Sequence, residues 1–137
     1  MPHELKESPG AIDLSVTAPD RAELFRAALA GVLDAAYGTA PPEGTNEGRV
    51  VPVQAAGDDD GVLLAGLVDD ALRAIREEPG TLRPPKWLSF DENRITATLP
   101  VQTPKTAGRA LEVSRAEVAA GETEWTARLE LLAPANG

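Results

Sequence analysis

Three consecutive aspartates, Asp58-Asp59-Asp60, are the densest set of side chains in this sequence that could do chemistry. Clustered carboxylate oxygens are the ligands that hard divalent cations prefer. Carboxylates in the first turn of a helix also accept hydrogen bonds from free backbone N–H groups and favour the positive end of the helix dipole. Because no further ligand spacing accompanies the run, we interpret it as a helix start.

For two other sets of residues, the position in the expected helix or strand indicates a structural role and not a chemical one. Asp69 and Asp70 are adjacent in a helical pattern, where neighbouring side chains point about 100° apart. We therefore expect them to be solvated, or Asp69 to pair with Arg73 at i+4. Trp87 and Trp125 could stack a ligand base, but their places in alternating strands favour packing in the core.

The composition excludes several kinds of catalytic site. The chain has no cysteine, which excludes disulfides, thiolate metal sites and cysteine nucleophiles. Its single histidine, His3, argues against a Ser-His-Asp triad and against a multi-histidine metal site. His3 stands in a terminal segment without a partner, so we expect a mobile surface residue.

The charge balance bears on the partners of the protein. In 137 residues, 13 Lys and Arg oppose 22 Asp and Glu, which gives a net charge of −9. Binding to nucleic acid by counterion release, or to an anionic membrane, needs a basic surface, so neither is expected. No segment resembles a signal peptide, and no apolar run approaches the ~20 residues that cross a bilayer. We therefore expect a cytoplasmic protein.

Hydrophobic periodicity predicts a single domain over residues 1–137, with a frayed tail from about 133 to 137. Helical spacing predicts helices near 20–37 and 60–78, the first beginning with a capping box from Asp20 to Glu23. Alternation predicts strands at 11–17, 50–55, 87–90, 95–99, 111–115 and 124–131. Pro52 cannot donate to a strand ladder, so its strand is expected at an edge.

The order of these elements predicts the fold class. A strand, a helix, a strand and a helix are followed by four strands, without an internal repeat. Because both helices are amphipathic, we expect an α+β two-layer sandwich with both helices packed on one face of a mixed β-sheet. Its core should contain Phe25, Leu29, Leu67 and Leu72.

Over nearly its whole length, the chain resembles the archease family. Residues 7–28 are similar to the family's opening, which is an acidic residue, His-Thr-Ala-Asp, an alternating strand and a helix with a Leu-Glu-Glu-x-Phe type start. Residues 63–72 are similar to its second helix, Leu-Leu-x-x-Trp-Leu-Asn-Glu-Leu-Leu. Glu112-Val113, and Trp125 at the start of the final strand, fit its C-terminal strand pair.

The resemblance implies a partner and a metal. Archeases accompany, and activate, the tRNA-splicing RNA ligase that works through a guanylated histidine, so an RNA ligase is the implied protein partner and Ca²⁺ or Mg²⁺ the implied cation. Ser8-Pro9-Gly10-Ala11 stands where the family has His-Thr-Ala-Asp, so the metal-binding Asp falls on Ala11. Asp13, two residues further on the same strand face, is the carboxylate that could replace it. For the family's second Asp, near the end of the chain, Glu130 is the nearest acid. Ser114 replaces the family's Lys.

Three functions stay open at this stage. The first is a non-catalytic, archease-like accessory or protein-interaction domain without the family metal site, because Ala11 offers no ligand. The alternative is a genuine archease that activates the RNA ligase through a metal-assisted guanylation step. The second alternative is a carboxylate-dependent hydrolase, since two carboxylates alone can do acid–base chemistry. The sequence leaves the oligomeric state open.

Overall fold

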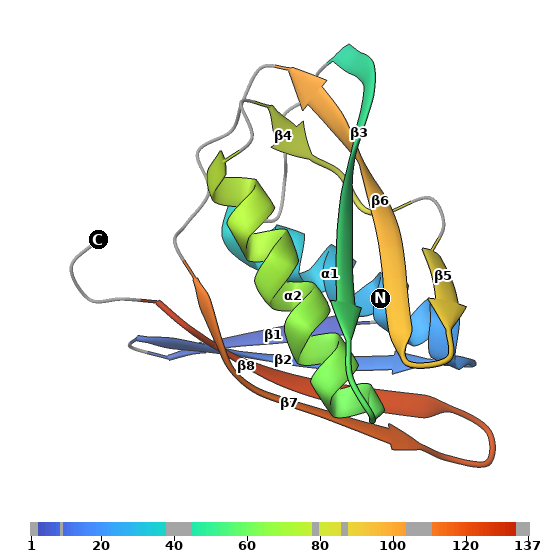
Figure 1. Cartoon of the computed structure of the whole chain (residues 1–137). Coiled ribbons are helices and arrows are strands. Elements are labelled where there is room, and N and C mark those ends of the chain that lie inside the picture. The colour runs from blue at the N-terminus through green and yellow to red at the C-terminus, as the bar shows by residue number, and fades with distance from the viewer. Residues whose placement is uncertain are drawn as a thin grey trace.

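The computed structural model describes residues 3–8, 10–37, 45–77, 80–85, 88–103 and 111–133, which form an α+β fold (Figure 1). The helices are α1 (Arg21–Tyr37) and α2 (Asp60–Glu77). One sheet, which we call the terminal sheet, has the order β1-β2-β8-β7 and contains β1 (His3–Ser8), β2 (Ala11–Ala18), β7 (Glu112–Ala120) and β8 (Trp125–Leu132). The other, the central sheet, has the order β3-β6-β4, with β5 also paired to β6, and contains β3 (Thr45–Ala56), β4 (Thr81–Leu82), β5 (Leu88–Asp91) and β6 (Arg94–Thr103).

The terminal sheet joins the two ends of the chain. β1 and β2 form a hairpin whose turn contains Gly10, with φ at +81°, a conformation that favours glycine. β2 then pairs with β8 without a shift of register, from Ala11 opposite Leu132 to Ala18 opposite Trp125. β7 and β8 form the second hairpin, with a bulge between Val113 and Arg115.

The α+β class and the packing of both amphipathic helices on β-structure, expected from the sequence, are confirmed. The strands differ in arrangement, because the described pairings form two antiparallel sheets where one mixed sheet was expected. The chain leaves the terminal sheet after β2, passes through α1 and enters the central sheet at β3. β3 and β4, which α2 joins, pair with β6 on either side of it, so strands joined by a helix are not neighbours among the described pairings.

The two chain ends also differ from expectation. His3 begins β1, where its backbone is opposite Val16 of β2, so the expected mobile terminal segment is a strand in the structure. At the other end, the Ala133 N–H donates to the Gly10 carbonyl at 3.0 Å. The rest of the expected frayed tail, 134–137, lies outside the described residues.

Both helices begin at the aspartates that the sequence indicated. The Glu23 N–H donates to Asp20 Oδ1 at 2.8 Å, which caps α1. Instead of reaching back to complete the capping box, the Glu23 carboxylate accepts a hydrogen bond from Arg26 Nη1 at 2.6 Å. In α2, Asp59 Oδ1 accepts from the Val62 N–H at 2.9 Å. The aspartate run is therefore a helix cap.

The core lies between the helices and the inner faces of the sheets. α1 covers the terminal sheet, chiefly β2, and α2 contacts both β3 of the central sheet and β7 of the terminal sheet. The four residues expected in the core are confirmed, each at most 2% exposed: Phe25, Leu29, Leu67 and Leu72. Neither described helix has the length and apolar character needed to cross a membrane.

Phe25→Ala should lower the free energy of unfolding by about 3–5 kcal/mol, because it removes a fully buried ring and leaves a cavity. Urea denaturation followed by circular dichroism measures the change. The control is Val62→Ala, at a position 50% exposed, which should stay within about 0.5 kcal/mol of the parent protein. Equal losses for both variants would contradict the placement of Phe25.

Tyr37 should make the fold sensitive to alkaline pH. Its hydroxyl accepts a hydrogen bond from the Leu82 N–H at 3.2 Å, and burial raises the pKa of Tyr37 above its ordinary value. Because the pKa is raised in the folded state, the neutral Tyr37 hydroxyl contributes to the free energy of unfolding. This contribution is complete below the unfolded pKa of about 10 and is lost as the pH rises through the folded value. Stability measured from pH 8 to 12 should fall less steeply in Tyr37→Phe than in the parent protein.

Candidate functional site

Asp13 and Glu130, the two carboxylates predicted as substitute metal ligands, lie directly opposite each other in the structure. Asp13 is on β2 and Glu130 on β8, and they are partners in the antiparallel register. Both belong to the outer face of the terminal sheet, because the alternating inner positions of these strands are buried under the helices. Asp13 is exposed and Glu130 is partly exposed.

Two basic residues flank this acidic pair in the same row of the sheet. Lys6 of β1 is the register partner of Asp13, and Arg115 of β7 is the register partner of Glu130. The row across β1-β2-β8-β7 therefore reads Lys, Asp, Glu, Arg. Opposite charges at directly opposed positions attract, so each acid has a basic cross-strand neighbour that offsets the repulsion between the two acids.

The acidic pair lies in a shallow polar basin of about 230 Å³ on the outer face. Arg128 and Glu117, themselves register partners, continue the charged surface one row further along the strands. Sequence reasoning missed the basic residues of this face, since only the pairing of β1, β8 and β7 brings them beside Asp13. The basin is lined by Asp13, Arg115, Glu117, Arg128, Leu129 and Glu130.

The position to which the resemblance assigns a metal ligand has no acid directly opposite it on β8. Ala11 of β2 is opposite Leu132 of β8, and Leu132 is 39% exposed. Neither side chain carries an oxygen, so this pair of positions offers a cation no side-chain ligand. In the described part of the chain, no three Asp, Glu, His or Cys side chains are grouped so that they could hold a metal ion.

The outer face can therefore do limited chemistry by itself. Two carboxylates at most would bind a hard cation here, whereas Ca²⁺ takes six to eight oxygen ligands. Acid–base catalysis is also poorly served, since Asp13 is exposed to water and catalytic carboxylates are tuned chiefly by burial and neighbouring charge. A flat face with both charge signs in fixed rows suits recognition of a complementary protein surface.

Asp60, the last residue of the aspartate run, serves the packing of the two helices. Arg21, at the start of α1, donates to Asp60 Oδ1 from Nε at 2.9 Å and from Nη2 at 2.5 Å. The guanidinium carbon of Arg21 lies 4.0 Å from the centre of the Phe90 ring, and Phe90 packs edge-on against Phe25 with ring centres 5.2 Å apart. This cluster ties the two helix starts to β5.

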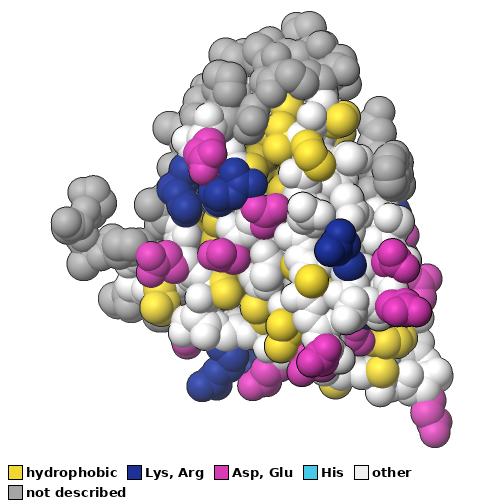
Figure 2. All heavy atoms as spheres, in the orientation of Figure 1, with side chains coloured by type: hydrophobic (Ala, Val, Ile, Leu, Met, Phe, Trp, Pro, Cys, Tyr) yellow, Lys and Arg dark blue, Asp and Glu magenta, His cyan; other side chains and the backbone are white. Residues whose placement is uncertain are grey.

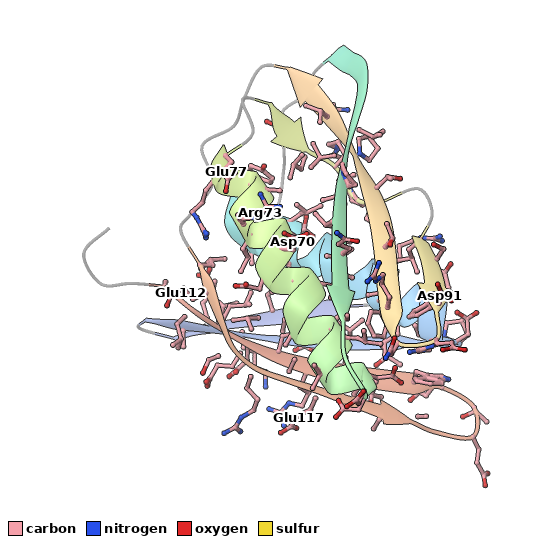
Figure 3. The ribbon with its side chains drawn as sticks, in the orientation of Figure 1. Asp70, Arg73, Glu77, Asp91, Glu112 and Glu117 are labelled. Atoms are coloured by element: carbon pink, nitrogen blue, oxygen red, sulfur yellow. The ribbon has the colours of Figure 1, made fainter. Side chains whose placement is uncertain are left out.

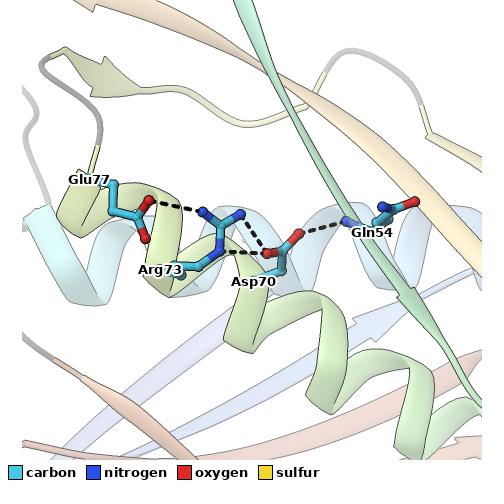
Figure 4. Close-up of polar contacts among 4 residues, drawn as sticks. All are labelled: Gln54, Asp70, Arg73 and Glu77. Carbon is cyan, nitrogen blue, oxygen red and sulfur yellow. Dashed lines mark hydrogen bonds and ion pairs between the residues drawn. The ribbon is translucent and has the colours of Figure 1, made fainter.

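A second polar network joins α2 to the edge of the central sheet (Figures 3 and 4). Asp70 Oδ2 accepts from the backbone N–H of Gln54 at 2.9 Å, and Asp70 Oδ1 accepts from Arg73 Nε and Nη2 at 2.9 and 2.7 Å. Arg73 Nη1 also donates to Glu77 at 3.3 Å. The sequence suggested Asp69 as the partner of Arg73, but Arg73 forms its ion pair with Asp70, at i+3.

This network depends on a close approach of α2 to β3. A Cβ atom on Gly66 would lie 2.9 Å from the Cβ of Ala55, too near for an ordinary contact. The absence of a side chain at Gly66 lets Asp70, one turn later, reach the strand. The groove beside the network has a volume of about 580 Å³ and is lined by Pro52, Gln54, Gly66, Asp69, Asp70, Arg73 and Thr96.

The remaining candidates from the sequence add no chemistry to the site. Trp125 is partly buried and packs against the core, as its alternating pattern indicated. Trp87 lies outside the described residues. On the face shown in Figure 2, acidic and basic side chains are intermixed and no broad basic surface forms.

Comparisons with known proteins support the fold. No protein-family model matches this chain, and a search of curated proteins finds no match. Among solved structures, the chain is similar to protein 1598 of Methanobacterium thermoautotrophicum, with a TM-score of 0.68 and 19% identity over 96% of this chain and 98% of that one. At this identity the likeness shows the fold alone.

Ca²⁺ and Mg²⁺ should bind no tighter than the millimolar range, which is typical of an incomplete set of oxygen ligands. Isothermal titration calorimetry of the apo protein measures this directly. Asp13→Asn and Glu130→Gln, titrated in parallel, should change the heats little. A micromolar site with one ion per chain that either variant abolishes would show that the ligands have moved along the sheet and that the metal site is retained.

Proposed function

We propose that this chain is an archease-like, non-catalytic accessory domain that acts by contacting a protein and does not use the family's metal site. The observation that carries the proposal is the composition of the outer face of the terminal sheet. Ala11 stands where the resemblance implies a metal ligand, its cross-strand partner Leu132 carries no oxygen, and the nearby acids are flanked by Lys6, Arg115 and Arg128.

The charge of the chain supports a protein partner over a nucleic acid. At a net charge of −9, the domain repels a polyanion at long range. A role in RNA ligation would therefore run through contact with the ligase, with acidic side chains of this domain meeting a basic patch on the larger protein. Such steering weakens as salt rises, because the Debye length falls from about 10 Å at 0.1 M to about 3 Å at 1 M.

One observation favours a second candidate function, a genuine archease that supports guanylation through a bound cation. Asp13 and Glu130 are register partners, so two carboxylates do converge on one point of the sheet, two residues from the position of the family ligand. In this candidate the partner supplies the remaining oxygen ligands. Tight cation binding by the isolated chain is not required, but the complex must then depend on the cation.

Affinity capture from native lysate, followed by binding of the purified partner, tests the proposal. Glu130→Lys replaces an acid of the central row and should weaken that binding. The matched control is Glu92→Lys, which makes the same change of charge in the exposed turn between β5 and β6 and should leave binding intact. Equal loss in both variants would point to net charge alone, and loss on chelation of divalent cations would favour the second candidate.

The domain should show no measurable affinity for a tRNA stem-loop at physiological salt, because any contact would be made against the net negative charge. Fluorescence anisotropy of a labelled stem-loop, at low and physiological ionic strength, is the measurement. Micromolar binding that survives physiological salt would contradict the protein-contact model. It would direct attention to a local arginine cluster, with Arg73, Arg76 and Arg83 as the first residues to substitute.

A further inference from the structure

The two sheets protect their edge strands to different degrees. An edge strand presents unpaired N–H and C=O groups to solvent and is a template for another strand unless something blunts it. At the β3 edge, Pro52 has no N–H, and the Gln54 N–H is capped by Asp70. β7 carries a bulge between Val113 and Arg115. β4 is only two residues long.

β1 has neither a proline nor a bulge among the described residues, and the charges it carries on its outer face, Glu4 and Lys6, are of opposite sign. It is a six-residue strand at the end of the terminal sheet, paired only with β2 in the described sheet order. Its register with β2 runs from Ser8 opposite Ala11 to His3 opposite Val16 without a shift. No proline interrupts it between His3 and Ser8.

The hairpin geometry determines which groups of β1 face outward. Ser8 and Ala11 flank a two-residue turn, so they form the first hydrogen-bonded pair of the hairpin. Hydrogen-bonded and non-hydrogen-bonded pairs alternate along an antiparallel ladder. Lys6 and Glu4 therefore hydrogen-bond toward β2, and the N–H and C=O of Leu5 point away from the sheet.

The charges of β1 are complementary to those of a second β1 strand that runs antiparallel to it and is centred on the same residue, Leu5. In an antiparallel pairing of two β1 strands centred on Leu5, Glu4 of each strand is opposite Lys6 of the other. Both side chains are exposed, and both belong to the outer face, since their partners across β2 are Ser15 and Asp13. Leu5, at the centre, is partly buried against the core and would face the same residue of the second strand.

We propose that the outer edge of β1 binds the β1 edge of a second copy of this chain, about a two-fold axis at Leu5. The two Leu5 residues exchange a pair of backbone hydrogen bonds, and two Glu4–Lys6 pairs flank them. The terminal sheets of the two copies then form one continuous eight-stranded sheet, and their outer faces become a single surface. A symmetric pairing of this kind closes on itself and does not extend into a filament.

Charge substitution on β1, with self-association as the readout, tests the proposal. Analytical ultracentrifugation of the full chain over a range of concentrations should show a monomer–dimer equilibrium. Glu4→Lys places like charges opposite each other twice per dimer and should raise the dissociation constant at least about tenfold. The double variant Glu4→Lys with Lys6→Glu restores opposite charges and should return the constant to within about threefold of the parent.

Two controls separate the pairing from other effects. Glu117→Lys makes the same charge change on β7, at the far side of the same sheet, and should leave the dissociation constant unchanged. Circular dichroism melts show that each variant is folded. Exchange of the Leu5 amide with solvent should slow as protein concentration rises, which a dimer formed elsewhere would not cause.

Three results would overturn the proposal. The first is a protein that stays monomeric at every concentration up to about 100 μM. The second is a dimer that Glu4→Lys does not weaken. The third is a folded double variant that stays as weak as Glu4→Lys, because the pairing would then not follow the register centred on Leu5.

Discussion

The antiparallel pairing of β2 with β8 is the constraint on which the rest of the structure depends. It joins residues near the two ends of the chain over eight register pairs without a shift. Its inner face supplies Ile12, Leu14, Leu129 and Leu131, all at most 2% exposed, as the surface on which α1 packs. A slip of one residue would turn this apolar face toward water and the charged face toward the helices, so the burial of the inner face fixes the register.

The same register brings the residues of the candidate site together. The sequence could therefore predict the site only as far as it could predict which strands pair. Local signals were sufficient for the helices, because Asp20 and Asp59 cap them and their apolar positions recur at helical spacing. The edge position of the Pro52 strand followed from the missing N–H. Strand partners are long-range choices, so periodicity could not show that Asp13 faces Glu130, or that the strands divide into two sheets. β1 was missed because its charged residues weaken the hydrophobic alternation.

The polar contacts of the helices show why clusters of charge in this chain are mostly structural. Asp59 and Asp70 each satisfy a backbone N–H, and Asp60 holds Arg21 over the Phe90 ring. A carboxylate in such a role is already engaged and is poorly placed to bind a cation or move a proton. The outer face of the terminal sheet differs, since no described helix covers it and its charges oppose one another across strands.

That uncovered face combines few possible cation ligands with a fixed pattern of both charge signs. A cation site needs several oxygens and an excess of negative charge at one point, whereas the row of Lys6, Asp13, Glu130 and Arg115 sums to zero. With Ala11 and Leu132 beside it, the face has little attraction for an ion but a fixed pattern of both charge signs. Such a pattern gives specificity and a favourable rate of encounter to a partner with the complementary pattern, at little cost in desolvation because the side chains remain near water. The strand pairing therefore sets the chemistry of this face, because it places side chains of opposite charge beside one another along one row of the described residues.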